Sequence, residues 1–555
     1  MPTESVRPAA EVVPPLAVRD PDQWLAVACW LVVAFASLNI LLYSFGRDQG
    51  IYAVVADAIT QGKMPYRDAW DFKPPGIFLV YALAQSLFGK SMLAIRLLEV
   101  IGLVATVFGL QRLAQVFLDR PRAGLVCGAV AALVHAELEF WHTAQPETFG
   151  GFLTVAALVV VTLEPEKRRQ WLVPFGMGAL FGVCALLKPP LGGGILVCGA
   201  YLLTRDQTRA AGKAWPAMAR TLLLTGSGFA LPLALVLGWI AARGAWPAFW
   251  WTFHDFVPGY TQLNWGNAHA PGMLYHALEE AFFKFSALVA FGVIACIAMS
   301  PLHAREREGI YLVLGIVAIQ LTGIVMQGKF FAYHYAATLL LISFLAGIGV
   351  YKLFRRCLMA GSGSLLALAA FVLVAIDMRD AVRDLPQHFS DRVQMRLAFL
   401  TRQAPFLSRA DLDRELSYVA DYNLDADRSV ALEIRSRTAS DDPVFIWGFE
   451  PSTYFLAERP LASRFIYDVP QRTPWQRDFS RRELLKDLSL NRPKVIVVQQ
   501  RDVFPAVTGS PLDSRDELPN FPELKGLIDT QYRLVRELED FQIFERSEQP
   551  SVSGS

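Results

Sequence analysis

The stretch WLAVACWLVVAFASLNILLYSFGRDQGIY, residues 24–52, decides the fold class. Its apolar part lies in an uncharged run from Gln23 to Gly46, which covers the roughly 20 residues that a helix needs to cross a bilayer. Arg47 and Asp48 then end the run. The pattern predicts a membrane helix followed by a polar loop at one membrane face.

The rest of the chain repeats this pattern. Its 555 residues are 53% hydrophobic with a mean hydropathy of +0.33, yet the net charge is only +1, which argues against nucleic acid as a partner. The fold class is therefore a polytopic α-helical membrane protein. We predict about eleven membrane helices, near residues 24–45, 95–117, 122–141, 148–163, 171–187, 190–203, 220–242, 284–301, 309–326, 330–352 and 360–377.

Positive charge gathers in every second short loop, at residues 120–122, 167–169, 205–213, 305–307 and 355–356. The positive-inside rule then places the N-terminus in the cytoplasm, and an odd number of spans places the C-terminus outside. We predict a multi-pass protein of the inner (plasma) membrane. The apolar segment 76–89 is too short to span comfortably, so we expect it to lie along the outer interface.

Composition changes beyond Asp377, because the last third of the chain carries more than half of all Asp and Glu residues. We predict a soluble periplasmic or extracellular α/β domain there, with polar helices over residues 378–440 and strands at 443–448 and 494–498. The predicted domains are a cytoplasmic segment 1–23, a transmembrane domain 24–377 with an outer catalytic loop 46–94, and this soluble domain 378–555.

The outer loop carries the chemistry. It reads GRDQGIY at 46–52, DFKPPG at 71–76 and AIRL at 94–97. A carboxylate at the membrane surface can orient or deprotonate an acceptor hydroxyl, and Asp48 is our candidate for that catalytic role. The alternative is that Asp48 caps a helix starting near Gly50, since Asp is a favoured N-cap.

Four cations are predicted at the outer ends of spans: Lys73, Arg96, Lys188 and Lys329. Positive charge on the outer side runs against the positive-inside rule, and binding of a lipid phosphate would explain it. The alternative is that these side chains snorkel to the outer headgroups. Because the turn Lys188-Pro189-Pro190 repeats Lys73-Pro74-Pro75, we expect both turns to present an ammonium towards one site.

Further candidates lie at the same outer level. Glu147 follows the third predicted span and is a second catalytic carboxylate, with helix capping as its alternative role. Tyr52, His334 and Tyr335 are candidates for donor or acceptor contact, and a structural role is the alternative for the histidine. The aromatic segment 246–265 fits an interfacial belt, or else a gate for the donor.

No metal site is predicted. His142, His254, Asp48 and Glu147 lack the helical spacing of a dedicated site, and a dependence on a divalent metal stays open. No nucleotide-binding motif is present either, so the sequence gives no reason to expect an ATP-driven reaction.

Residues 46–97 resemble the first outer loop of the GT-C superfamily, specifically the bacterial relatives of protein O-mannosyltransferases and of lipid A aminoarabinose transferase. The resemblance implies a GT-C fold and transfer of a sugar from a polyprenyl-phosphate donor to a cell-envelope hydroxyl of a lipid, glycan or protein. It assigns the catalytic aspartate to Asp48, a place beside the lipid phosphate to Arg96, and the acidic residue of the active cavity to Glu147. It also implies inversion at the anomeric carbon.

Two other functions stay open at this point. A transporter or flippase for lipid-linked sugars would also use outer cations and aromatic residues, although it predicts ionisable residues along a path through the bilayer. A ligase or polymerase for lipid-linked glycans would share the fold and use larger donors. The sequence does not identify the sugar or the acceptor.

Overall fold

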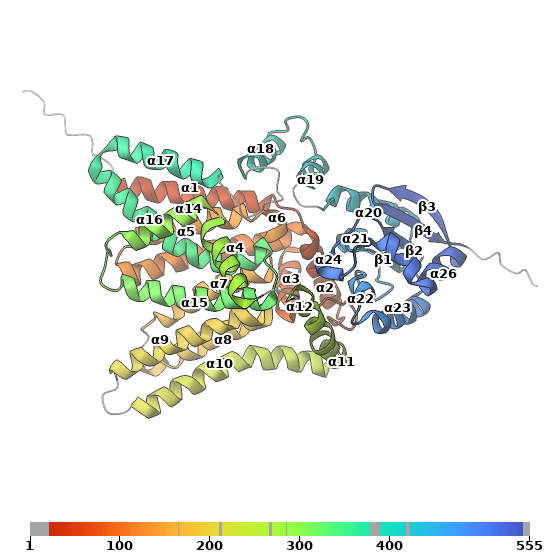
Figure 1. The fold of residues 1–555 in the computed structure, drawn as a ribbon, viewed down its shortest axis with the longest axis horizontal. Coiled ribbons are helices and arrows are strands. Elements are labelled where there is room, and N and C mark those ends of the chain that lie inside the picture. The colour runs from red at the N-terminus through yellow and green to blue at the C-terminus, as the bar shows by residue number, and fades with distance from the viewer. Residues whose placement is uncertain are drawn as a thin grey trace, which may run out of the picture.

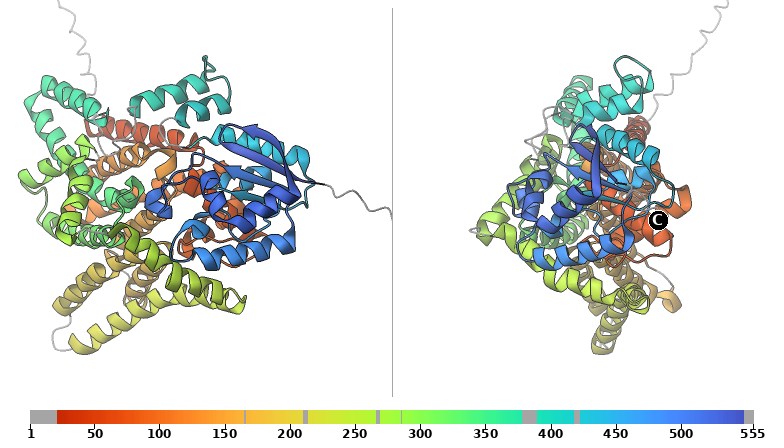
Figure 2. Two further views of the ribbon diagram at one scale, coloured as in Figure 1. Left: turned by 45° about the vertical axis from the view of Figure 1, so that its right-hand side comes forward. Right: turned by 90° about the vertical axis from the view of Figure 1, so that its right-hand side faces the viewer.

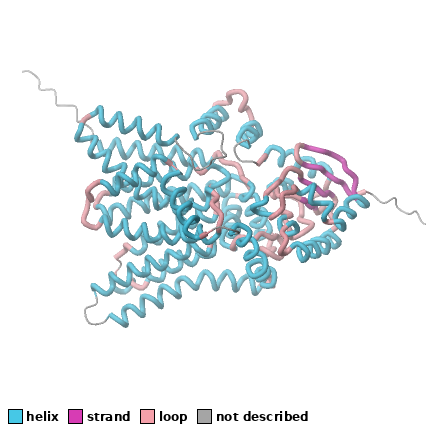
Figure 3. Tube along the Cα trace, viewed as in Figure 1, coloured by secondary structure: helices cyan, strands magenta, loops and turns pink. Residues whose placement is uncertain are grey.

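The computed structural model describes residues 21–547, except residues 165, 210–213, 266–268, 285, 378–388 and 418–421. Most of the predicted cytoplasmic segment 1–23 and the predicted domain boundary at residue 378 therefore lie outside the described residues. A long helical bundle forms one part of the molecule, and all described strands lie in a smaller region at one end of it (Figure 1, Figure 3).

Eleven helices of the bundle overlap the eleven predicted segments. They are α1 (Pro21–Leu41), α4 (Met92–Leu118), α5 (Pro121–Glu137), α7 (Pro146–Val161), α8 (Leu172–Leu187), α9 (Gly194–Arg209), α10 (Ala214–Ala242), α14 (Ala287–Ala298), α15 (Glu306–Gln327), α16 (Ala336–Ala360) and α17 (Ser362–Asp377). By length and composition, five of the described helices are able to cross a membrane, or six if one bent pair counts as a single span. The helical class is confirmed, while eleven crossings stay a prediction.

Two of these helices differ from the predicted boundaries. The segment predicted at 122–141 breaks after α5, because Glu139 adopts a left-handed backbone conformation with a φ of +67° before the short helix α6 (Glu139–His142). The Glu139 carboxylate forms an ion pair with Arg392, at 2.9 Å. The segment predicted from residue 190 begins as the 3₁₀ helix η2 (Pro189–Gly193), and α9 follows it.

Short helices fill the junction between the bundle and the smaller region (Figure 1). The predicted interfacial segment forms α3 (Pro75–Phe88), which packs against α2 (Arg47–Thr60), α4 and α8. The remaining short helices before residue 336 are η1 (Lys167–Arg169), α11 (Trp246–Trp250), η3 (Trp251–Phe256), α12 (Val257–Trp265), α13 (Ala270–Glu279), η4 (Glu280–Lys284) and η5 (Ala332–Tyr335). These elements position the side chains described below.

The region from residue 389 onwards, here termed the C-terminal region, contains a four-stranded sheet. Strands β1 (Val444–Trp447) and β2 (Val495–Gln499) pair in parallel and match the predicted strands. The sequence prediction missed the antiparallel hairpin of β3 (Tyr532–Leu538) and β4 (Phe541–Arg546), which completes the order β1-β2-β4-β3. The helices are α18 (Phe389–Leu400), α19 (Arg409–Ser417), α20 (Leu424–Arg437), α21 (Ser452–Ala457), α22 (Val469–Arg472), α23 (Arg477–Asn491), α24 (Pro505–Thr508), α25 (Ser514–Glu517), η6 (Leu518–Asn520) and α26 (Pro522–Gln531).

The two ends of the bundle differ in their charged groups. Asp22, at the start of α1, lies 2.8 Å from Arg122 and 3.5 Å from Arg355, and both arginines belong to loops predicted to be cytoplasmic. This cluster lies at the end of the bundle away from the C-terminal region, and the rotated views keep the sheet at the other end (Figure 1, Figure 2). The arrangement agrees with the predicted sidedness, which stays a prediction.

Candidate functional site

A cavity of about 210 Å³, here termed the lysine cavity, lies where the bundle meets the C-terminal region. It collects side chains from the loop before α3, from α7, η2, α12 and η5. Six residues predicted from the sequence line it: Tyr52, Lys73, Glu147, Lys188, Lys329 and His334. Both lysine-proline-proline turns therefore contribute their lysine to one cavity, and three lysine side chains converge on a small space.

Lys73 forms one polar corner of the cavity, and Asp48 lies beside it without lining the cavity itself. The Lys73 ammonium lies 3.8 Å from Asp48 Oδ1 and 3.8 Å from Asp71 Oδ1. Burial disfavours the charged form of Lys73, but the nearby carboxylates of Asp48 and Asp71 outweigh burial and raise its pKa. Lys73 is therefore a permanent cation, and both ion pairs are long enough for an anionic ligand to compete with them.

Asp48 is placed by the start of α2 but does not cap it. The helix begins at Arg47 with Gly46 as the N-cap, so the capping alternative for Asp48 is wrong. Gln49 serves the helix start instead, because its Oε1 accepts from the Gly46 amide at 3.0 Å. The Asp48 side chain is 21% exposed, and its Oδ2 accepts from Gln145 at 3.3 Å. This carboxylate therefore stays accessible beside Lys73.

Glu147 forms the second polar corner of the cavity. It lies in the first turn of α7, where it pairs with Lys188, and His334 Nε2 lies 4.0 Å from its Oε1. Its other oxygen, Oε2, is buried without a hydrogen-bond partner among the described residues. Burial outweighs the attraction of Glu147 and lowers the pKa of Lys188. The corner thus combines a cation with an acceptor that is free for a ligand.

Lys329 joins the cavity to the C-terminal region. Its ammonium lies over the face of Tyr260 and donates to the Ala506 carbonyl at 3.2 Å. Burial, together with the charge of Lys73, lowers the pKa of Lys329 to about 6. The snorkelling alternative fails for this residue, because its side chain is buried between protein elements.

Arg96 does not line the lysine cavity. Its guanidinium is fully buried, 2.8 Å from Glu99, and donates to Thr143 Oγ1 at 2.8 Å and to the Ser44 carbonyl at 2.7 Å. The placement beside the donor phosphate is thus corrected, because four hydrogen bonds occupy the two terminal nitrogens within the protein. Arg96 holds the loops around the site.

The late helix presents other aromatic residues than predicted. Tyr335 is buried and does not line the cavity, whereas Tyr333 does. In the segment 246–265, Trp250 is 52% exposed, while Phe253 and Tyr260 line the cavity. An interfacial belt and a gate for the donor both stay predictions for this segment. Sequence reasoning also missed Asp71, although it stands two residues before Lys73 in a motif that had been singled out.

No group of three His, Cys, Asp or Glu side chains lies close enough to hold a metal ion within the part of the chain that the structure describes. His254 is 62% exposed and contacts only Asp255 among the groups that could bind a metal. The described residues therefore offer no candidate set of metal ligands, and dependence on a divalent metal stays open.

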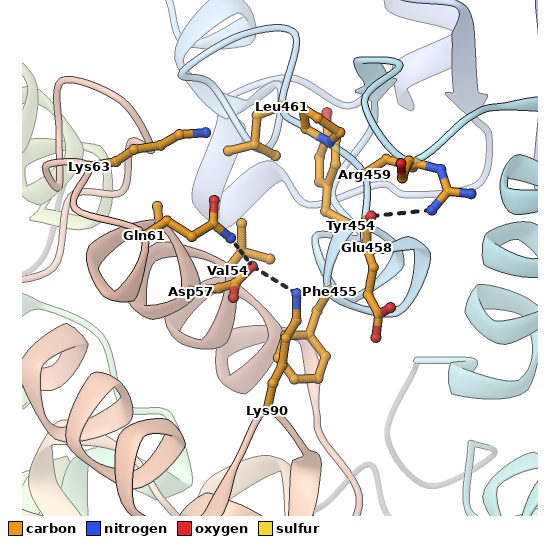
Figure 4. Close-up of a pocket in the computed structure, with 13 residues that line it drawn as sticks. Val54, Asp57, Gln61, Lys63, Lys90, Tyr454, Phe455, Glu458, Arg459 and Leu461 are labelled. Carbon is orange, nitrogen blue, oxygen red and sulfur yellow. Dashed lines mark hydrogen bonds and ion pairs between the residues drawn. The ribbon is translucent and has the colours of Figure 1, made fainter.

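A second pocket, of about 220 Å³, lies between the C-terminal end of α2 and α21 (Figure 4). Its central charges neutralise each other, because Asp57 lies 2.8 Å from Lys90 and accepts from Gln61 at 3.0 Å. None of the predicted site residues lines it. The chemistry therefore favours the lysine cavity as the functional site.

Comparison with known proteins shows which family model and which folds this chain resembles. The family model of dolichyl-phosphate-mannose-protein mannosyltransferases matches residues 72–231, a range that includes Lys73, Glu147 and Lys188. No curated protein sequence matches the chain. The crystal structure of ArnT from Cupriavidus metallidurans bound to undecaprenyl phosphate matches with a TM-score of 0.55 and 14% identity, over 97% of this chain and 100% of that chain.

Two further structures are similar. ArnT from the same organism in the apo state matches with a TM-score of 0.53 and 15% identity, over 94% of this chain and 97% of that chain. The Archaeoglobus fulgidus oligosaccharyltransferase reaches a TM-score of only 0.43 at 13% identity, over 84% and 68% of the two chains, which is too low to compare sites. The matches to ArnT show a shared fold, and together with the matching family model they confirm the predicted resemblance to GT-C glycosyltransferases.

Proposed function

We propose that this protein is a membrane glycosyltransferase that moves a sugar from a polyprenyl-phosphate donor to an acceptor hydroxyl at the outer membrane face. The observation that carries the proposal is the convergence of three lysines and Glu147 on one cavity, with the Asp48 carboxylate 3.8 Å from the Lys73 ammonium. A transporter would instead need ionisable groups along a path through the bilayer. The similarity to a structure bound to undecaprenyl phosphate supports the donor class.

In the proposed reaction, the acceptor oxygen attacks the anomeric carbon and the bond from that carbon to the phosphate oxygen breaks. The lipid phosphate leaves with the bonding electron pair, and the hydroxyl proton passes to the Asp48 carboxylate. Attack from the face opposite the phosphate inverts the anomeric centre. Asp48 suits this role because it is accessible and hydrogen-bonded to a neutral amide from Gln145.

The cations of the lysine cavity stabilise the charge that develops on the leaving phosphate. Lys73 is the first ligand in this proposal, because its pKa is raised and its ion pairs are long. Lys188 and Lys329 lie on the same cavity, and a bound phosphate would favour their charged forms as well. Glu147 would then hold Lys188 in place and accept a hydroxyl of the sugar through its free oxygen.

The direct test is transfer by purified protein in lipid, with labelled polyprenyl-phosphate sugars and extracts of cell-envelope acceptors. We expect label to move to an acceptor only with a lipid-phosphate donor, and to release the lipid phosphate in equal amount. Failure to bind or turn over any polyprenyl-phosphate donor would contradict the assignment.

The predicted orientation has its own test. Five of the six native cysteines are buried and Cys357 is half-buried, so one cysteine introduced on the surface can be labelled selectively. We expect Lys63→Cys, an exposed position in the predicted outer loop 46–94, to react with an impermeant maleimide in intact spheroplasts. Arg356→Cys, on the predicted cytoplasmic side, should react only after lysis. The reverse pattern would place the site in the cytosol and remove the proposal.

A further inference from the structure

The C-terminal region pairs with the loop that carries Lys73. The Trp70 amide donates to the Arg464 carbonyl at 2.7 Å, and Trp70 forms a parallel β-bridge with Phe465. The Trp70 ring packs against Tyr467 at a centroid distance of 5.6 Å. A strand-like segment of the C-terminal region therefore fixes the backbone of the loop at Trp70.

The same segment also reaches the polar corner of the site. The Tyr467 hydroxyl donates to Asp71 Oδ1 at 2.6 Å, and both side chains are fully buried. Asp71 Oδ2 accepts from the Lys73 amide at 3.1 Å. Burial and the charge of Asp71 raise the pKa of Tyr467, so its hydroxyl keeps the proton that it donates. The contact joins the C-terminal region to Lys73 through one carboxylate.

We propose that Tyr467 is a positioning residue of the transfer site: its hydroxyl anchors Asp71 and thereby holds the Lys73 ammonium between Asp71 and Asp48, facing the lysine cavity. This inference rests on the proposed function, because it takes Lys73 as the ligand of the donor phosphate. Tyr467 itself does not line the cavity, so it acts through Asp71 and Lys73.

The physical reason is competition for a buried carboxylate. Asp71 is fully buried, and Tyr467 satisfies one of its oxygens. Without that hydroxyl, the same oxygen can accept from the Lys73 ammonium, which lies 3.8 Å away. A closer Asp71–Lys73 pair would withdraw the ammonium from the cavity, and the donor phosphate would then compete with a tighter internal ion pair.

The experiment measures binding of undecaprenyl phosphate to the full chain in lipid nanodiscs. We expect Tyr467→Phe to raise the Kd roughly tenfold, in line with the loss of one charged hydrogen bond. The matched control is Tyr532→Phe, which removes a buried hydroxyl from the same region, one that donates to Pro493 at 2.8 Å far from the cavity. This control should leave the Kd unchanged.

A double-mutant cycle separates positioning from general stability. In a Lys73→Met background, Tyr467→Phe should change the Kd by less than twofold, because the group that it positions is gone. The positioning role would be overturned if Tyr467→Phe weakened binding equally with and without Lys73. It would also be overturned if Tyr467→Phe did not weaken binding in the otherwise wild-type protein. If the wild-type protein itself fails to bind, the donor assignment falls and this inference falls with it.

Discussion

Two charged corners at the same end of the bundle look alike in the sequence and differ in the structure. In the open corner, Lys73 lies 3.8 Å from Asp48, and the two side chains are 17% and 21% exposed. In the buried corner, Arg96 lies 2.8 Å from Glu99, and neither side chain is exposed. Lys73 of the open corner lines the lysine cavity, whereas Arg96 and Glu99 are not among the residues that line it.

The difference teaches how a binding cation is told from a structural one. A ligand can replace a long, partly hydrated ion pair at small cost, whereas a fully buried pair loses several hydrogen bonds when either partner moves. Substitutions in the open corner should therefore change chemistry and affinity, and those in the buried corner should change folding. The following predictions test that division.

The largest effect is expected at Asp48. Asp48→Asn keeps the shape and removes the base, so transfer should fall about 10²–10⁴-fold while donor binding is retained. The matched control is Asp57→Asn in the same helix, where the carboxylate pairs with Lys90 outside the lysine cavity. Turnover of labelled donor measures both. A fully active Asp48→Asn protein would remove this residue from the mechanism.

Arg96→Met should act on folding instead. Removing the Arg96 guanidinium leaves the buried Glu99 with only His135 as a basic partner among the described ion pairs, and we expect a loss of about 3–5 kcal/mol in the free energy of unfolding. Thermal unfolding in detergent measures the change. A variant that is as stable as the wild type but unable to bind undecaprenyl phosphate would contradict the structural role of Arg96.

Lys73→Met should show the opposite behaviour. We expect the Kd for undecaprenyl phosphate to rise roughly 10–100-fold, because one charge-assisted contact to phosphate is lost. The melting temperature should change less than it does in Arg96→Met, since the Lys73 pairs are longer and partly exposed. The Kd and the melting temperature should be measured for both variants. Equal changes in Kd and melting temperature for Lys73→Met and Arg96→Met would contradict the distinction between a binding cation and a structural one.

The smallest effect concerns Lys329 and pH. Its pKa is about 6 in the folded protein and lies near the ordinary lysine value in the unfolded chain. Between these values the unfolded chain binds more protons, so the stability of the wild type rises with pH from about 6 to about 10. Lys329→Met removes this dependence. Its melting temperature minus that of the wild type should therefore be larger at pH 7 than at pH 9, and a constant difference would contradict the shifted pKa.

Much of the fold could be predicted because apolar length and charged interruptions are local properties of the sequence. Strands β1 and β2 were visible as short apolar runs that become fully buried. The hairpin of β3 and β4 was not visible, since the residues of β3 are mostly exposed or half-buried and read as polar chain. The breaks at Glu139 and at η2 depend on tertiary ion pairs and on proline turns.

The site was predictable only in part. Three charged residues beside the ends of predicted spans line the cavity: Lys73, Lys188 and Glu147. Charged groups are costly near the membrane interior, so their positions already indicated a function. Burial by neighbouring loops made Arg96 structural, and no local pattern reveals such burial. Tyr467 carried no motif at all, because its partner lies 396 residues earlier in the chain.

That long separation has a consequence for biosynthesis. The loop that holds Lys73 emerges early from the ribosome, whereas the segment that pairs with it follows only after the whole bundle has been made. A nascent chain halted before residue 464 would have its lysines in place without the hydroxyl that steadies them. We therefore expect competence for the proposed sugar transfer to be acquired late in translation, when the last third of the polypeptide docks on the loop that holds Lys73.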